Sequence, residues 1–297
     1  MRGVFTALIT PFQDNGSLDL DAFERLLKDQ KSARISGVIP CGTTGESPTL
    51  STEEKKTLIE LAILTLKGTG VKVIAGTGSN DTRKAVELSA WASEAGADGV
   101  LVVTPYYNKP SQTAMDRHFR EVADSVSCEV FLYNVPGRTG VSMTAATMAG
   151  LATHPQITSV KEATGNTSLT SEILDLLGEN KLDILSGDDA TYLPLLSVGA
   201  VGVVSVASNL FPRGMVAIQN HFEGGRIEEA KHLHQEFYPL FRDLFVDSNP
   251  VPIKYAMARQ GFCRNVLRSP LIPLSTSDAS RLNTSMERCG FKAQGTL

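Results

Sequence analysis

Residues 71–105 read VKVIAGTGSNDTRKAVELSAWASEAGADGVLVVTP. An apolar, β-branched run begins at Val71, a helical pattern follows over 81–95, and a second apolar run begins at Gly99. Near-continuous apolar runs are typical of parallel strands that are buried on both faces. A strand, a crossover helix and a second strand in this order predict one βα repeat of a parallel sheet.

The same alternation extends along the chain in both directions. The expected strands begin at Val4, Gly37, Val71, Gly99, Glu129, Ile157, Leu182 and Gly202. Successive starts are about 28 residues apart on average, which suits a βα unit with its crossover helix. The helices expected from amphipathic patterns include 18–33, 51–66, 81–95 and 111–126. The sequence STEE at 51–54 also predicts a capping box at the start of its helix.

Eight βα units have two main solutions, an open doubly wound sheet and a closed barrel. The count of eight favours closure, and so does the lack of a G-x-G-x-x-G motif after the first strand. We therefore predict an α/β fold of the (β/α)8 TIM barrel class. The pattern becomes purely helical after Gly224-Gly225, which predicts a catalytic barrel over 1–225 and a C-terminal α-helical domain over 226–297.

Composition excludes several classes of protein. The 297 residues include 28 Lys+Arg and 32 Asp+Glu, for a net charge of −4, and no basic stripe suggests a nucleic-acid partner. Four cysteines far apart in a long chain do not resemble a disulfide scaffold. The longest apolar stretch is too short for a membrane span, and the apolar N-terminus has no signal-peptide cleavage site. We expect a cytoplasmic protein that binds neither nucleic acid nor membrane.

Barrel enzymes place their chemistry at the carboxyl ends of the strands, where Lys161 stands out. Alternation puts Ser159, Lys161 and Ala163 on one face of the sixth strand. If that face points inward, the small neighbours leave room for the lysine and a substrate. Desolvation then favours the neutral amine, which can attack a carbonyl and form a Schiff base. From these residues alone, a solvated lysine at a frayed strand end is an equal alternative.

Two other loops carry residues suited to the same chemistry. In CGTTGES, after the second strand, the N–H groups of Thr43 and Thr44 could face a carboxylate, and the Thr44 hydroxyl could relay a proton. In YNVPGRTG, Tyr133 ends the strand beside that of the lysine, and Arg138 could bind a carboxylate bidentately. An ordinary glycine-rich turn and a solvated arginine are the alternatives.

Together GTTGES, TPYYNKPS, YNVPGRTG, VKEATG and LSGDD, in this order and spacing, resemble the dihydrodipicolinate synthase (4-hydroxy-tetrahydrodipicolinate synthase) family of class I pyruvate-dependent barrel enzymes. The resemblance covers nearly the whole chain. It implies a carbon–oxygen lyase that condenses pyruvate with L-aspartate 4-semialdehyde on the diaminopimelate route to lysine. It also implies a homotetramer, built as a dimer of dimers, that needs no metal or cofactor because pyruvate is held as a covalent Schiff base.

The resemblance also assigns roles to single residues, motif by motif. Lys161 would form the Schiff base with pyruvate. Tyr133, Thr44 and Tyr107 would form a proton relay, with Tyr107 supplied by a neighbouring subunit. Arg138 would bind the carboxylate of the semialdehyde. The remaining substrate contacts are assigned to the amides of Thr43 and Thr44 and to Gly187 and Val204.

One group of residues departs from the family pattern. Members that lysine inhibits bind it with residues matching Ser47, Asn80 and Tyr106, and they commonly carry Glu at the position of Lys84. An ammonium at Lys84 would repel the ammonium of bound lysine, where a carboxylate would attract it. We therefore expect feedback inhibition to be weak or absent.

Several other functions fit the sequence less well. An N-acetylneuraminate lyase or a 2-keto-3-deoxy-sugar-acid aldolase would share the scaffold, but GRTG around Arg138 favours a short acidic aldehyde. A metal-dependent aldolase or hydrolase needs a ligand cluster, whereas the five histidines are expected on helices or helix ends. The acidic pair Asp188-Asp189 argues against a phosphate-bearing cofactor at that loop. A catalytically silent barrel is disfavoured because every relay residue is present.

Overall fold

The computed structural model describes residues 1–292, and its strands form a closed parallel barrel in chain order. The strands are β1 (Gly3–Ala7), β2 (Gly37–Ile39), β3 (Lys72–Gly76), β4 (Gly99–Val103), β5 (Glu129–Asn134), β6 (Ile157–Glu162), β7 (Asp183–Ser186) and β8 (Gly202–Ser205). Each lies within or beside an apolar run expected from the sequence. The predicted TIM barrel is confirmed.

Helices alternate with these strands and then continue beyond the barrel. The α-helices are α1 (Leu20–Ser32), α2 (Thr52–Leu66), α3 (Thr82–Glu94), α4 (Gln112–Asp124), α5 (Pro136–Thr139), α6 (Ala145–Leu151), α7 (Thr167–Leu176), α8 (Tyr192–Ser197), α9 (Pro212–Glu223), α10 (Ile227–Asp243), α11 (Val251–Arg259) and α12 (Thr276–Arg288). Two short 3₁₀ helices are η1 (Ser47–Thr49) and η2 (Ala207–Asn209). None of the helices in residues 1–292 combines the length and the apolar character that crossing a bilayer requires.

The capping residues explain why the observed helices are slightly shorter than predicted. The helix expected over 81–95 is α3, for which Asp81 is the N-cap and accepts a hydrogen bond from the N–H of Arg83. Cap residues flank a helix and lie only half inside it, so a pattern that includes them overstates its length. The capping box before α2 is confirmed, because the Ser51 hydroxyl accepts from the N–H of Glu54 while the Glu54 carboxylate accepts from the N–H of Ser51.

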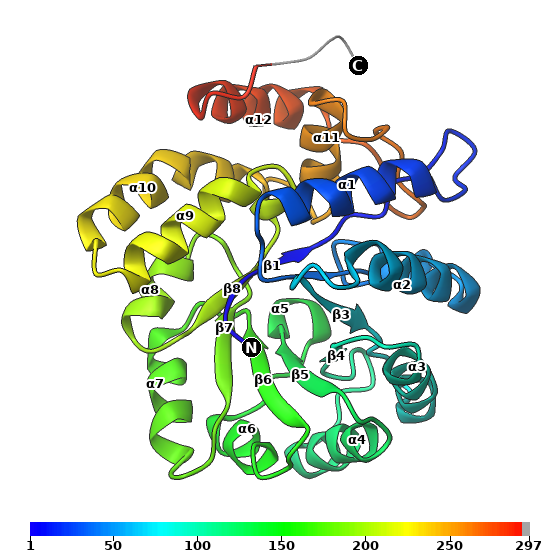
Figure 1. The fold of residues 1–297 in the computed structure, drawn as a ribbon, viewed down its shortest axis with the longest axis vertical. Helices are drawn as coiled ribbons and strands as arrows, with labels where there is room; N and C mark the ends of the chain where they lie inside the picture. Colours follow the sequence, from blue (N-terminus) through cyan, green and yellow to red (C-terminus); the bar gives the residue numbers. More distant parts are fainter. Residues whose placement is uncertain (293–297) are drawn as a thin grey trace. The chain divides into compact units, whose positions relative to one another are not determined.

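The chain falls into two compact units. The first consists of residues 1–3 and 72–204, and in Figure 1 its helices α3, α4, α6 and α7 follow one another around the outside of its strands. Its strands pair in parallel from β3 to β8, with Tyr133 of β5 opposite Lys161 of β6. This register places the two side chains on neighbouring strands at the same level.

The second unit consists of residues 4–71 and the chain from 205 onward. It contains the parallel pair β1 and β2 and the helices α1, α2 and α9 to α12. Helix α9 ends just before Gly224, and α10 packs against both α9 and α12. The helical extension is therefore present as expected, while a domain boundary at residue 225 stays a prediction.

A buried carboxylate joins α10 to α12. Asp243 accepts hydrogen bonds from the Arg281 guanidinium at 3.0 Å, from the Ser285 hydroxyl at 2.6 Å and from its neighbour Arg242 at 2.7 Å. Burial raises the pKa of Asp243, but the hydrogen bonds from Arg242, Ser285 and Arg281 outweigh it and lower the pKa from 3.8 to about 2.

This lowered pKa predicts a specific acid sensitivity. The ionised Asp243 stabilises the fold above its unfolded pKa of 3.8, and that contribution is lost as pH falls through about 2. The free energy at stake is on the order of 2 kcal/mol. Urea unfolding should therefore show Asp243→Asn less stable than the wild type at pH 7, with the difference shrinking below pH 4. Glu228→Gln, at an exposed pair, is the control, and a gap that does not change with pH would contradict the prediction.

Candidate functional site

Lys161 is buried near the carboxyl end of β6, with only 5% of its surface exposed. Ser159, two residues earlier, is also buried. Within the described residues the Lys161 amine forms no hydrogen bond or ion pair. The side chain is therefore enclosed rather than hydrated, and a lysine amine in its neutral form can act as a nucleophile. The surface-lysine alternative is therefore wrong.

Tyr133 is the side chain that lies beside this amine. The Lys161 Nζ is 4.2 Å from the centre of the Tyr133 ring, and both residues are buried. Their Cα atoms are partners in the β5–β6 register. The two residues, which the sequence placed at the ends of neighbouring strands, are thus brought together, with the Tyr133 ring beside the Lys161 amine.

The opposite face of β6 carries a buried carboxylate that the sequence reasoning did not select. Glu162 accepts hydrogen bonds from the Thr164 hydroxyl at 2.6 Å and from the Asn134 amide at 3.1 Å. Burial raises the pKa of Glu162, although the hydrogen bonds from Thr164, Asn134 and Gly165 act to lower it. The carboxylate ties β5 to the turn after β6, and so it holds the strand end that carries Lys161. The sequence feature that could have identified Glu162 is its position in VKEATG, directly after Lys161.

Gly187 and Val204 lie at the ends of β7 and β8. Val204 is fully buried, and the N–H of Gly187 donates to the carbonyl of Glu162 at 2.7 Å. A Cβ atom at Gly187 would lie 2.5 Å from the Cβ of Ala163 and 2.9 Å from its Cα. Glycine is therefore required here because the backbone after β7 approaches the end of β6 too closely for any side chain.

That close approach predicts the effect of a single methyl group. We expect Gly187→Ala to lower the free energy of unfolding by about 1–3 kcal/mol, since Ala163 would have to move. Chemical denaturation measures the loss. Gly150→Ala is the matched control, because a Cβ at Gly150 of α6 meets no atom within 4 Å. Equal stability of the two variants would contradict the close approach.

The loop after β4 meets the turn that carries Arg138. Arg138 is exposed in α5, which is one turn of helix over Pro136–Thr139. The N–H of Tyr107 donates to the carbonyl of Thr139, the next residue, at 3.4 Å. Tyr107 is 89% exposed and has a positive φ of 72°. Its backbone is thus held near Arg138 in an unusual conformation while its ring projects outward.

Three residues of the expected lysine site lie in the first unit. The Asn80 amide donates to the carbonyl of Tyr106 at 3.2 Å, and the Asn108 amide donates to the carbonyl of Asn80 at 2.8 Å. The structure therefore brings Asn80 and Tyr106 together. Lys84 is exposed on α3, and Ser47 belongs to the second unit. A lysine site formed by these residues stays a prediction.

In the second unit, the loop after β2 forms a tight series of turns. The N–H of Gly45 donates to the carbonyl of Gly42, and the N–H of Glu46 donates to the carbonyl of Thr43, both at 3.1 Å. No hydrogen bond in residues 1–292 uses the N–H of Thr43 or Thr44. Both N–H groups thus remain available to an anion such as a carboxylate.

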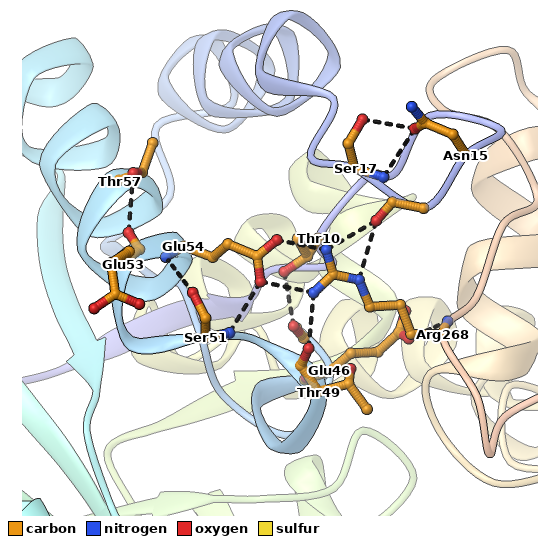
Figure 2. A network of polar contacts seen from close by, with 12 residues as sticks. Thr10, Asn15, Ser17, Glu46, Thr49, Ser51, Glu53, Glu54, Thr57 and Arg268 are labelled. Carbon is orange, nitrogen blue, oxygen red and sulfur yellow. Dashed lines mark hydrogen bonds and ion pairs between the residues drawn. The ribbon is translucent and has the colours of Figure 1, made fainter.

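The end of this loop, at Glu46, belongs to a polar network that the sequence did not reveal (Figure 2). The amine of Lys254 in α11 lies 2.6 Å from the carboxylate of Glu46, and both side chains are buried. The backbone N–H of Arg268 donates to the other Glu46 oxygen at 3.0 Å, and its guanidinium binds the Glu54 carboxylate. Burial lowers the pKa of Lys254, while Glu46 acts to raise it. The network fixes the loop that carries the two threonines.

The side chains that could bind a metal ion are scattered in the part of the chain that the structure describes. Within residues 1–292, no group of three or more His, Cys, Asp or Glu side chains could hold a metal ion. His118 is buried in α4, and burial lowers its pKa to about 4. Its ring nitrogen bonds to the Thr82 hydroxyl at 2.9 Å, which is a contact between α3 and α4. The described histidines therefore supply no metal centre.

Comparison with known proteins assigns the chain to a protein family. A sequence model of the dihydrodipicolinate synthetase family matches residues 1–288. The chain belongs to this family. A 4-hydroxy-tetrahydrodipicolinate synthase from Leptospira biflexa is 47% identical over 279 residues, which are 94% of each chain.

Solved structures agree with this placement. The 4-hydroxy-tetrahydrodipicolinate synthase of Methylacidiphilum fumariolicum SolV has a TM-score of 0.94 and 47% identity, covering 98% of this chain and 96% of that one. The dihydrodipicolinate synthase of Acinetobacter baumannii, solved in complex with pyruvate, has a TM-score of 0.95 and 36% identity, covering 98% and 99%. The chain is thus a member of a family of lyases.

Proposed function

We propose that this chain is a 4-hydroxy-tetrahydrodipicolinate synthase, which condenses pyruvate with L-aspartate 4-semialdehyde on the diaminopimelate route to lysine. The observation that carries the proposal is the buried Lys161 amine, which lies against the Tyr133 ring and has no counter-charge within the described residues. A lysine amine at the end of a barrel strand can form a covalent imine with a keto acid. The family membership reported above favours the synthase over a sugar-acid aldolase.

The chemistry follows from an electron sink. The Lys161 nitrogen adds to the C2 carbonyl of pyruvate, and loss of water leaves an iminium. The iminium draws electrons from the methyl group, so that the methyl carbon loses a proton and becomes the nucleophilic carbon of an enamine. This carbon attacks the aldehyde of the semialdehyde and forms the new C–C bond. The amino group of the added chain then displaces Lys161 from C2, which closes the ring and returns the free amine. Since Lys161 itself supplies the reactive group, the reaction requires no metal or cofactor.

Each of these steps moves a proton, and the relay is assigned to three hydroxyl groups. Tyr133 exchanges protons with the substrate, Thr44 follows it, and Tyr107 of a neighbouring subunit completes the chain. An isolated phenol, with a pKa of about 10, is a poor acid–base catalyst at neutral pH, so hydrogen-bonded neighbours are needed to share the proton. The unused N–H groups of Thr43 and Thr44 suit the pyruvate carboxylate.

The second substrate is assigned to Arg138. The exposed guanidinium, carried on one turn of helix beside the Tyr107 loop, can bind a carboxylate through two parallel hydrogen bonds. A polyhydroxylated sugar chain would instead call for hydroxyl-binding groups. Gly187 and Val204 complete the assignment at the ends of β7 and β8, where the backbone is closely packed.

The assembly proposed is a homotetramer, a dimer of dimers. Tyr107 is almost fully exposed and Tyr106 is partly exposed in the single chain. Large exposed aromatic rings at a loop tip are typical of surfaces that a partner covers. The proposal includes a cytoplasmic location without a membrane or nucleic-acid partner, which the biosynthetic role supports.

Reductive trapping tests the proposal directly. Incubation with pyruvate and borohydride should add one pyruvate-derived group, located at Lys161 by peptide mass spectrometry. Lys161→Ala should give no adduct, although the other lysines remain. Turnover of pyruvate with L-aspartate 4-semialdehyde should far exceed cleavage of N-acetylneuraminate or 2-keto-3-deoxy-sugar acids. An adduct at another lysine, or faster sugar-acid cleavage, would refute the assignment.

Regulation by lysine gives a further prediction. We expect L-lysine to inhibit turnover weakly or not at all, because the exposed ammonium of Lys84 repels its ammonium. Half-inhibition at sub-millimolar L-lysine in a steady-state assay would refute this. Lys84→Glu should lower the concentration needed for half-inhibition, whereas Arg83→Glu, the same charge change at the adjacent exposed residue, should not.

A further inference from the structure

The second unit contains a side-chain contact to Thr44 that the reaction scheme above does not use. The Asn249 amide nitrogen donates a hydrogen bond to the Thr44 Oγ1 at 2.9 Å. Both side chains are buried, although the residues are 205 positions apart in the sequence. Asn249 lies just before α11, outside every motif that the sequence analysis selected.

The direction of this hydrogen bond constrains the threonine hydroxyl. A hydroxyl has one proton to donate and two lone pairs that accept. Because the Asn249 N–H group points at Oγ1, it occupies one lone pair of the Thr44 oxygen. The Thr44 proton must then point away from that amide nitrogen, toward another acceptor. One of the three staggered orientations of a hydroxyl rotor that would otherwise turn freely is thereby excluded.

From this geometry we infer that Asn249 is a positioning residue for the proton relay. The inference rests on the proposed function. In the relay, Thr44 gives its hydroxyl proton to the oxygen of Tyr133 and takes one from Tyr107 in the same step, so that no charge accumulates on the threonine. Asn249 neither gains nor loses a proton. It keeps the Thr44 proton aimed along the relay and supplies a fixed dipole to the Thr44 oxygen as the proton leaves.

The surrounding network makes this orientation rigid. Lys254 follows Asn249 by five residues, and Glu46 follows Thr44 by two. The Lys254 amine donates a hydrogen bond to the Glu46 carboxylate at 2.6 Å. The N–H of Glu46 in turn donates to the carbonyl of Thr43. The segment from Asn249 to Lys254 therefore holds the loop at two points, the threonine hydroxyl and the buried carboxylate. A hydrogen bond between two anchored groups keeps its direction, which is what a relay requires.

Asn249→Asp tests the inference because it conserves shape and reverses polarity. The ionised carboxylate can only accept, so the Thr44 hydroxyl would donate to it and leave the relay. We expect kcat to fall by about tenfold to a hundredfold, the scale of an impaired proton transfer. The KM for pyruvate should stay within about threefold, since the loss lies in a chemical step rather than in uniform binding. Lower pH should reduce the defect relative to the wild type, because a protonated carboxyl can donate again.

Three further variants define the outcome. Asn283→Asp makes the same exchange where the Asn283 amide donates to the Tyr255 hydroxyl at 2.9 Å, and it should keep the wild-type kcat and pH profile. Asn249→Ala, which introduces no charge, should show the kcat loss without recovery at low pH. In a Thr44→Val background, Asn249→Asp should cause no additional loss. Circular dichroism and thermal melting verify that each variant is folded.

The results separate the two proposals. If the wild type traps pyruvate and turns over, but Asn249→Asp and Asn249→Ala both match Asn283→Asp, the positioning role is overturned and the synthase assignment stands. A kcat loss that is equal at every pH and equally large in the Thr44→Val background would also overturn it, because this describes a purely structural residue. If the wild type neither traps pyruvate nor turns over, the proposed function fails and the inference fails with it.

Discussion

Replacing Lys161 with methionine is expected to lower kcat for the condensation by about 10⁴-fold or more, the scale observed when a covalent nucleophile is removed. The amine that forms the proposed imine is lost, and it is the Lys161 amine that lies 4.2 Å from the centre of the Tyr133 ring. The stability of Lys161→Met, in contrast to its activity, should not fall. Because the Lys161 amine is buried without a counter-charge, an apolar side chain of similar length should leave the free energy of unfolding equal to the wild-type value or higher.

Lys161→Arg is the matched control for charge. A guanidinium keeps a cation at the position but is always protonated and cannot add to a carbonyl, so this variant should be as inactive as Lys161→Met. It should also be less stable, since it forces a charge into a buried site. Steady-state turnover and urea unfolding measure the two effects. Activity within a hundredfold of the wild type in either variant would contradict the Schiff-base role.

The largest loss of stability is expected from Lys254→Met. This change leaves the Glu46 carboxylate buried without its partner, and breaking a buried ion pair from one side costs about 3–5 kcal/mol. Lys254 is 0% exposed, and its amine also lies 4.1 Å from the centre of the Phe12 ring. The amine is therefore enclosed on several sides, and water has no ready route to replace it. Denaturant unfolding, with melting temperature as a second measure, tests the prediction.

The double variant Glu46→Gln/Lys254→Met separates charge from packing. With no charge left in the site, it should be more stable than Lys254→Met alone, and the glutamine oxygen can still accept from the N–H of Arg268. Lys231→Met breaks the exposed pair with Glu228 and should cost less than about 1 kcal/mol. A similarly small cost for Lys254→Met would show that the buried pair contributes little.

The barrel follows from local properties of the chain, and this is why its prediction succeeded. A short apolar run favours a buried strand wherever it occurs in the chain. Helix caps act over three or four residues, as Ser51 and Glu54 show. Alternation along β6 likewise separates Lys161 from Glu162, because side chains of a strand point to opposite faces in turn. The motifs that resemble the family lie at these strand ends, so candidate site residues could be named from the sequence.

The contacts that support the candidate site could not be predicted from the sequence. Asn249 and Thr44 are 205 positions apart, and Lys254 and Glu46 are 208 apart. In the sequence, Lys254 is an ordinary helical lysine, and Glu46 is one residue of a glycine-rich turn. Only folding removes water from both and leaves each as the other's partner. Periodicity and capping depend on neighbours along the chain, whereas the loss of solvent around a charge or a hydroxyl depends on which distant segments pack against it.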